Sequence, residues 1–369
     1  LYIDYNIKKG VEVEYWDMTS LLRYDFQEMG ALDVDYLRNI KTYKEFDDLV
    51  CLPENQSAVY VMVVAYNNRY IRPFKILSSY NCKMVYTYDG IMPIAKEVSK
   101  LQRIISQLKT DIADGRPFNL IQIVVDLLLL KLYQKLNILN PFEIEFVVGE
   151  GLLSANFYAK KVVPISYFDF DKFKKSENSN DNIVDGKYIL FIDHNAPFHS
   201  DNLGTGRKFP DPEIYFKSIN RIIGLIEESQ NLKVVIAASP KSKYGAEKYE
   251  GREFYRLMTP ELTKKAEYIV MPYASSSISY AILNFKPMLF IYNDELMKVQ
   301  PSSVIEQKNV AAYLNIELYN ADLITHGNQL IVRPPIKEHY DSYKYNFLTS
   351  HESENKLSTE IFWNEISKL

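Results

Sequence analysis

Cysteine is scarce in this chain, and its scarcity excludes two classes of protein. Only two cysteines, Cys51 and Cys82, occur among 369 residues, and neither belongs to a CxxC motif or to a cluster of cysteines and histidines. A disulfide framework or a structural zinc site needs several such residues at short spacings. We therefore expect a protein of a reducing, cytoplasmic compartment.

A strong charge of one sign and a long apolar run are also missing. The net charge is −4, whereas a dedicated nucleic-acid binder has a basic footprint, so no nucleic-acid partner is expected. The most apolar segment, 120–132, contains Asp126 and is shorter than the roughly 20 residues that span a bilayer. It predicts a buried helix instead. No signal-peptide pattern is visible after Leu1.

Apolar residues are abundant enough for packed interiors. Hydrophobic residues make up 47% and aromatic residues 14% of the chain, which argues against wholesale disorder. The length suits two domains of roughly 150 to 200 residues each. Residues 171–186 are polar and rich in turn formers, which is typical of a linker. We expect an N-terminal domain at 1–170, this linker, a C-terminal domain at 187–350, and a final helix in 351–369 that crosses back to the first domain.

Predicted strands and helices alternate along both halves. Strands are predicted at 11–17, 58–65, 83–88, 143–148, 162–167, 187–193, 233–238, 268–271, 288–292 and 329–332. Helices are predicted at 35–50, 69–79, 94–113, 118–137, 213–229, 260–266, 304–314 and 355–368. Continuous apolar strands are typical of parallel sheets covered on both faces. The fold class is therefore predicted to be α/β, with two Rossmann-like domains facing a cleft.

A serine triplet marks the most informative stretch. An apolar run ends at Pro272, then Ser275, Ser276 and Ser277 precede a helical pattern. Such a helix start offers hydroxyl donors, backbone N–H groups and the positive end of the helix dipole at the carboxyl edge of the sheet. The stretch predicts a phosphate site. The alternative is that the serines only cap the helix.

An acidic residue follows the strand predicted at 83–88. Asp89 stands at the strand terminus, and Gly90 lets the backbone turn and a substrate approach. Asp89 is a candidate general base that takes a proton from a hydroxyl group. The alternative is an ordinary Asp-Gly turn.

The loop after the strand at 187–193 holds two of the five histidines, His194 and His199. Their spacing matches no zinc or magnesium signature. We expect His194 and Asn195 to make polar contacts with a sugar or a phosphate, and a purely structural loop is the alternative. Farther along, Arg207 and Lys208 add cations that suit phosphate or carboxylate groups, or a solvated turn.

The loop after the strand at 233–238 brings a proline and two lysines. Pro240 fixes the backbone, and Lys241 and Lys243 supply positive charge. Together they suit a nucleotide base and its phosphate. The alternative is that the lysines are only solvated.

Three of these motifs, taken in order, resemble those of a known family. Tyr88-Asp89-Gly90, Ser239-Pro240-Lys241 and Ser275-Ser276-Ser277 are similar to the acidic D/E-D/E-G, His-Pro and Ser/Thr motifs of bacterial GT-B sialyltransferases and of related Kdo and other nonulosonate transferases. The resemblance covers most of the chain. It departs from the pattern at Tyr88, where the family has an acid, and at Ser239, where it has histidine.

The resemblance implies roles for these residues. Asp89 would be the base in an acceptor-side N-terminal domain. In a donor-side C-terminal domain, Pro240 and Lys241 would contact the nucleotide, and the serines would hold its phosphate.

The implied activity is transfer of a nonulosonate, such as sialic acid or Kdo, from a CMP-activated donor to a glycan acceptor in surface-polysaccharide biosynthesis. We expect it to need no metal or other cofactor. A lipid-linked acceptor implies peripheral contact with the inner face of the membrane. Three alternatives stay open: a UDP-sugar transferase, a nucleotide-sugar epimerase, and a non-catalytic assembly partner.

Overall fold

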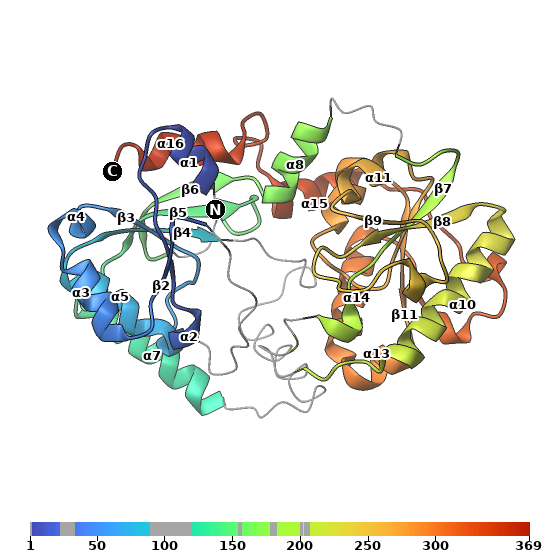
Figure 1. The fold of residues 1–369 in the computed structure, drawn as a ribbon, viewed down its shortest axis with the longest axis horizontal. Coiled ribbons are helices and arrows are strands. Elements are labelled where there is room, and N and C mark those ends of the chain that lie inside the picture. Colours follow the sequence, from blue (N-terminus) through green and yellow to red (C-terminus); the bar gives the residue numbers. More distant parts are fainter. Residues whose placement is uncertain are drawn as a thin grey trace. The chain divides into compact units, whose positions relative to one another are not determined.

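The structure is a computed structural model that describes residues 2–22, 34–88, 120–153, 157–177, 183–199, 202 and 207–369. The chain forms two compact units (Figure 1). The first unit comprises Leu1–Gly90, Asn119–Ser166 and Thr349–Leu369, and the second comprises Ile91–Phe118 and Tyr167–Leu348. Each unit is described by itself.

The first unit is built on a parallel sheet with the strand order β3-β4-β5-β6, and a separate short parallel pair joins β1 to β2. Its strands are β1 Tyr15–Asp17, β2 Leu37–Asn39, β3 Val59–Met62, β4 Lys83–Tyr88, β5 Phe142–Val148 and β6 Ala159–Ile165. Its helices are α1 Ile3–Lys8, α2 Thr19–Leu22, α3 Tyr43–Val50, α4 Pro53–Gln56, η1 Asn68–Tyr70, α5 Ile71–Ser79, α7 Leu120–Lys135 and α16 Ser358–Ile366.

The last segment of the chain packs on the first unit. Phe362 of α16 is buried, and its ring centroid lies 5.0 Å from that of Phe146 in β5 and 5.2 Å from that of Tyr2. Lys161 of β6 forms an ion pair with Glu365 of the same helix. Residues from the two ends of the chain are therefore part of one core.

Helix α7 differs from the buried helix that its composition predicts. Leu130 and Tyr133 pack on the core of the first unit. The opposite side of the helix and the residue after it are exposed at Val124, Val125, Leu127, Leu128, Leu132 and Leu136. Because the helix is apolar on all sides, its sequence does not show which side meets the core. Among the described residues, no helix is both long and apolar enough to cross a membrane.

The second unit is a doubly wound parallel sheet with the order β12-β11-β10-β7-β8-β9. Its strands are β7 Tyr188–Ile192, β8 Lys233–Ala238, β9 Phe254–Arg256, β10 Ile269–Met271, β11 Met288–Tyr292 and β12 Leu318–Asn320. Its helices are α8 Phe168–Ser176, η2 Ala196–Phe198, α10 Pro212–Gln230, η3 Ala246–Tyr249, α11 Thr259–Lys265, α12 Ile278–Leu283, α13 Asp294–Val299, α14 Pro301–Leu314, η4 Ala321–Leu323, η5 Gly327–Gln329, α15 Lys337–Tyr343 and η6 Lys344–Leu348.

Alternate side chains of its strands point to opposite faces of the sheet and pack into two separate hydrophobic cores. Leu190 of β7 belongs to the core that includes α11, α12, α14 and α15. Its neighbour Ile189 belongs to the core that includes α10. Both faces of the sheet are thus covered by helices (Figure 1), which is the reason for the continuous apolar strands in the sequence. The predicted α/β class with two Rossmann-like domains is confirmed.

Four local predictions need correction. The range 35–50 begins with the strand β2, the strand at 329–332 is not formed, and the edge strands β9 and β12 were not predicted. Strands of three residues are too short to show a period in the sequence. Helix α8 occupies the first part of the linker predicted at 171–186, because the buried Phe170 anchors it to the second unit. The helix predicted at 94–113 lies outside the described residues.

Candidate functional site

The second unit has its topological switch point between β7 and β10. These two strands are adjacent in the sheet, and the chain runs outward from them in opposite directions, to β8 and β9 on one side and to β11 and β12 on the other. In open parallel sheets, ligands bind in the crevice outside the carboxyl ends of the strands at such a point. The loops that begin after Ile192 and Met271 are therefore the first place to seek a site.

A small polar pocket lies at this point. Its volume is about 110 Å³. The lining residues come from the loop after β7, the loop after β10 and the junction of α13 with α14: His194, Ala196, His199, Asn202, Arg207, Tyr273 and Gln300. Imidazole, amide, guanidinium and phenol groups thus share one hollow of the second unit, and this donor set suits an anionic, hydroxyl-rich ligand.

Aromatic stacking fixes one wall of the pocket. The ring of His194 lies nearly parallel to that of Tyr273, at an interplanar angle of 4° with the centroids 3.8 Å apart. Its centroid is 4.6 Å from that of His199. Burial, followed by the charges of His199, Lys241 and Arg207, lowers the pKa of His194 well below its usual value. His194 is therefore neutral at physiological pH, in a region of positive potential.

Arg207 supplies the cation of the pocket. Its Nη1 donates to the Tyr273 hydroxyl at 3.2 Å, and its Nη2 lies 3.2 Å from Glu306 in α14. Ser303 also donates to the Tyr273 hydroxyl, at 3.3 Å. The guanidinium is mostly buried, with its side chain 17% exposed. A cation held this way is preorganised to meet a phosphate or a carboxylate.

Asp193 ties together the loops that surround the pocket. The buried carboxylate accepts hydrogen bonds at 2.8 Å from the hydroxyls of Tyr244 and Tyr249, and at 2.9 Å from the backbone N–H of Asn195. A longer contact of 3.5 Å joins it to the N–H of Ser239. Burial raises the pKa of Asp193 against the lowering effect of these donors. The loop after β8 is in this way anchored beside the loop after β7.

The predicted serine triplet follows β10 in the same loop as Tyr273. Ser277 is the N-cap of α12 but makes no side-chain cap bond. Contrary to the expectation of free N–H groups, the first three N–H groups of α12 donate to the carbonyls of Ser275, Ser276 and Ser277. Within the described part of the chain, the three serine hydroxyls form no hydrogen bond. They are the donors that this helix start leaves available.

Asp169 of α8 holds the first turn of α12 in place. The Tyr280 hydroxyl donates to this buried carboxylate at 2.7 Å, and the Ser279 hydroxyl does so at 3.2 Å. Burial raises the pKa of Asp169, and the two donors and Lys172 oppose that rise. The helix start is therefore positioned by side chains other than the serine triplet.

The other predicted residues fall into two groups. Pro240 and Lys241 are exposed in the loop after β8, and Asn195 is buried in a left-handed conformation with φ of 59°. They lie at the same carboxyl edge as His194 and the serines, because β8, β7 and β10 are neighbouring parallel strands. Asp89 and Gly90 lie outside the described residues, and so their predicted role stays a prediction.

Sequence reasoning missed three polar lining residues, Tyr273, Asn202 and Gln300, and the apolar Ala196. Tyr273 lies between Pro272 and the serines, and its place two residues after the strand predicted at 268–271 was a usable signal. Gln300 follows β11 and α13, so only the fold brings it to the pocket, where its Nε2 donates to the carbonyl of Lys208 at 2.6 Å.

Metal ligands are not gathered at any described position. Over the residues that the structure places, no group of three or more His, Cys, Asp or Glu side chains is arranged to hold an ion. The chemistry on offer at the pocket is hydrogen bonding, stacking and positive charge.

Comparison with known proteins gives structural likeness only. No family model and no curated protein matches the chain. Among solved structures, the spinosyn forosaminyltransferase SpnP is 11% identical with a TM-score of 0.39, and the match covers 89% of this chain and 76% of the SpnP chain. The calicheamicin glycosyltransferase CalG4 is 9% identical with a TM-score of 0.44, covering 88% and 74%. MnaA of S. aureus, solved with UDP, is 16% identical with a TM-score of 0.39, covering 88% and 78%. With TM-scores below 0.5, these likenesses do not decide what this chain does.

Proposed function

We propose that the protein is a glycosyltransferase whose second unit binds a nucleotide-sugar donor at the switch-point pocket. The observation that carries the proposal is the pocket in which Arg207 donates to Tyr273 and neutral His194 stacks on the same ring, with the serine triplet following Tyr273 in the loop after β10. Glycosyl transfer needs electrostatic relief for the departing phosphate at the moment the sugar bond breaks. A guanidinium and preorganised hydroxyls provide that relief.

The roles of the donor-side residues follow from their positions. Ser275, Ser276 and Ser277 would donate to phosphate oxygens, and Arg207 would neutralise the charge that builds on the leaving group. Lys241, exposed in the loop after β8, would add a second positive charge, with Pro240 supporting the base. His194 and Asn195 would border the sugar. This arrangement supports transfer without bound metal, which the use of EDTA in the assay tests.

The donor that we propose is a CMP-linked nonulosonate, on the resemblance of the three motifs. A UDP-linked sugar is the second candidate, because Ser239 replaces the histidine of the family pattern. Asp89 is the base that the sequence proposes for the acceptor hydroxyl. An epimerase and a non-catalytic assembly partner are the remaining alternatives, and the same assay separates them.

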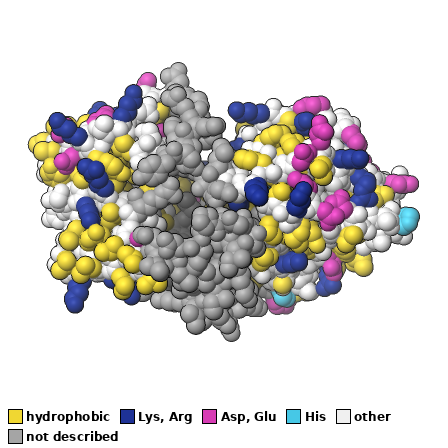
Figure 2. All heavy atoms as spheres, turned by 90° about the horizontal axis from the view of Figure 1, so that it is seen from below, with side chains coloured by type: hydrophobic (Ala, Val, Ile, Leu, Met, Phe, Trp, Pro, Cys, Tyr) yellow, Lys and Arg dark blue, Asp and Glu magenta, His cyan; other side chains and the backbone are white. Residues whose placement is uncertain are grey.

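We also propose that α7 contacts the membrane that carries a lipid-linked acceptor. Its exposed face combines apolar side chains such as Leu128 and Leu132 with the exposed Lys131 and Lys135. Asp126 is turned away toward Asn68, whose Nδ2 donates to its Oδ1 at 3.0 Å. Hydrophobic side chains gather on the surface of the first unit in Figure 2. Apolar residues with flanking lysines suit the interface of an anionic bilayer.

The decisive experiment is a turnover assay over a panel of CMP- and UDP-sugars with EDTA present. Turnover of one CMP-linked sugar supports the first donor, and turnover of a UDP-sugar alone supports the second. Conversion of a nucleotide sugar to its epimer without transfer supports the epimerase. A folded protein that binds and converts no donor contradicts the proposed activity and favours the assembly role. Isothermal titration with CMP and with UDP measures binding separately from chemistry.

A further inference from the structure

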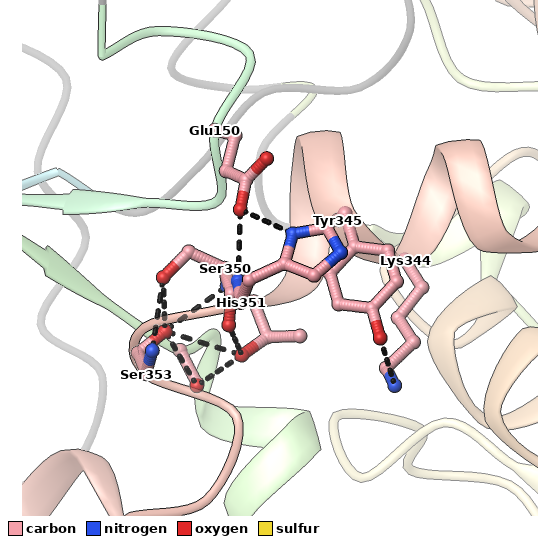
Figure 3. Close-up of polar contacts among 8 residues, drawn as sticks. Glu150, Lys344, Tyr345, Ser350, His351 and Ser353 are labelled. Carbon is pink, nitrogen blue, oxygen red and sulfur yellow. Dashed lines mark hydrogen bonds and ion pairs between the residues drawn. The ribbon is translucent and has the colours of Figure 1, made fainter.

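A carboxylate–imidazole pair lies at the carboxyl edge of the sheet in the first unit. Glu150 follows β5 in the sequence Gly149-Glu150-Gly151, and His351 comes from the turn that returns the chain to this unit. One carboxylate oxygen, Oε1, accepts from the backbone N–H of His351 at 2.8 Å and lies 2.8 Å from its Nδ1. Figure 3 shows the imidazole with its Nδ1 directed at the carboxylate.

The pairing fixes the chemistry of the ring. When Nδ1–H donates to a carboxylate, the proton-accepting nitrogen of the neutral imidazole is Nε2. The two hydrogen bonds from His351 lower the pKa of Glu150, so the orienting carboxylate stays ionised through the range in which an imidazole titrates. An imidazole base whose orientation is set by a hydrogen bond to a carboxylate is an arrangement found in general-base catalysis.

The turn that carries His351 is built rigidly. Four buried hydroxyl side chains surround its base. Ser166 bonds to Thr349 at 2.7 Å. Ser350 bonds to Ser353 at 2.8 Å, as Figure 3 shows. Ser350 and Ser353 also exchange backbone-to-hydroxyl bonds, each of 3.0 Å. On the other side of the pair, Gly149 has φ of +70°, a conformation that glycine adopts without strain. Buried polar networks of this kind specify one geometry.

The position of the pair also suits a role in activating an acceptor. It is accessible, with side chains 67% exposed at His351 and 35% at Glu150. The carboxyl end of β5 lies beside that of β4, where Tyr88 is paired in register with Val147. In the sequence, the predicted base Asp89 is the residue after Tyr88.

We propose that His351, oriented by Glu150, is the general base that activates the acceptor hydroxyl. This inference rests on the proposed glycosyltransferase function. In the step, the acceptor oxygen bonds to the anomeric carbon while the bond from that carbon to the donor phosphate oxygen breaks, and the nucleotide leaves with the electron pair. The hydroxyl proton passes to Nε2 of His351 and from there to water. Glu150 is a positioning residue.

The competing account is that the pair only fastens the returning chain to the first unit. Lys161 and Glu365 provide the matched control, because their ion pair also fastens this segment to the unit, from β6 to α16. Glu354 is the other carboxylate that acts electrostatically on Glu150. The turn is preceded in the chain by Lys344 and Tyr345. The Lys344 Nζ donates a hydrogen bond of 3.2 Å to the Tyr345 hydroxyl.

The test compares His351→Gln, Glu150→Gln, Asp89→Asn and Glu365→Gln in the full chain. His351→Gln is expected to lower kcat at least about 100-fold, the usual contribution of a general base, with donor KM within about twofold. Glu150→Gln is expected to lower kcat less and to reduce the share of the Nδ1–H tautomer of His351 in nitrogen NMR, because the imidazole loses the carboxylate that accepts this proton. Added imidazole should restore part of the activity of His351→Ala, and Glu365→Gln should turn over normally.

Several results would overturn the assignment. Full activity of His351→Gln with loss only in Asp89→Asn returns the role to Asp89. Equal losses in His351→Gln and Glu365→Gln, without rescue by imidazole, leave the pair a structural fastening. If wild type converts no donor, the proposed function fails instead. The tautomer gives a readout that needs no turnover: nitrogen NMR should show His351 protonated at Nδ1 near neutral pH, and protonation at Nε2 refutes the pairing.

Discussion

Glu145 is a buried carboxylate whose ionisation should control the stability of the first unit. It lies in β5, between β4 and β6, and is 6% exposed. Burial raises its pKa from 4.5 to about 7. A carboxyl group whose pKa is raised by folding binds more protons in the folded state, so its contribution is most favourable below pH 4.5 and is lost as the pH rises to about 7.

The perturbation is Glu145→Gln, which cannot ionise. Each pH unit between the unfolded pKa of 4.5 and the folded pKa of about 7 is worth about 1.4 kcal/mol, so the full difference amounts to roughly 3.5 kcal/mol as an upper bound. Relative to the variant, the wild-type unit should lose stability by up to this amount between pH 4.5 and 8. Above pH 8 the difference should be constant, because Glu145 is then ionised in both states.

The assay is urea unfolding followed by tryptophan fluorescence at several pH values. Both tryptophans of the chain, Trp16 and Trp363, lie in the first unit, so the signal reports that unit alone. Glu143→Gln is the matched control, since Glu143 lies two residues away on the same strand and pairs with Lys160 at the surface. Parallel pH dependences in wild type and Glu145→Gln would refute the reasoning.

Three further predictions concern the second unit and α7. Asp193→Ala should lower the unfolding free energy of the second unit by about 3–6 kcal/mol, because it leaves two tyrosine hydroxyls and a backbone N–H buried without an acceptor. Amide hydrogen exchange measures this loss of stability, and unchanged protection of the amides would contradict the prediction. Arg207→Met should weaken nucleotide binding at least about tenfold, because a charged contact is lost. The control variant Arg333→Met removes the surface ion pair with Glu317 and should leave nucleotide binding unchanged. Isothermal titration calorimetry measures both affinities. The double change Leu128→Asp and Leu132→Asp should abolish flotation with anionic vesicles while leaving the fold intact, and undiminished flotation rejects α7 as the contact.

The sequence determined the fold class because the signal for a buried parallel strand is local. Runs such as Ile189–Ile192 and Val234–Ala238 are apolar at every position, since both faces of the sheet are covered. The short edge strands β9 and β12 lack that signal, and only pairing with their neighbours defines them. The sequence also predicted which loops carry the polar residues of the second unit, because a loop after a parallel strand must reach the carboxyl edge.

Other features depend on contacts between segments that are distant in the chain. The stacking of His194 on Tyr273 joins residues in the loops after two neighbouring strands, and Gln300 reaches the same pocket only through the turn between α13 and α14. No local pattern encodes such meetings, because they follow from the order of the strands in the sheet.

The pairing of Glu150 with His351 is the clearest case. The two residues are 201 positions apart, and in the sequence each stands in an unremarkable polar turn. The sequence alone determined two α/β domains and the loops in which polar groups gather. The tertiary structure decided which of those groups share a pocket and which side of α7 is left exposed, because packing and the return of the chain to the first unit bring together residues that no local periodicity relates.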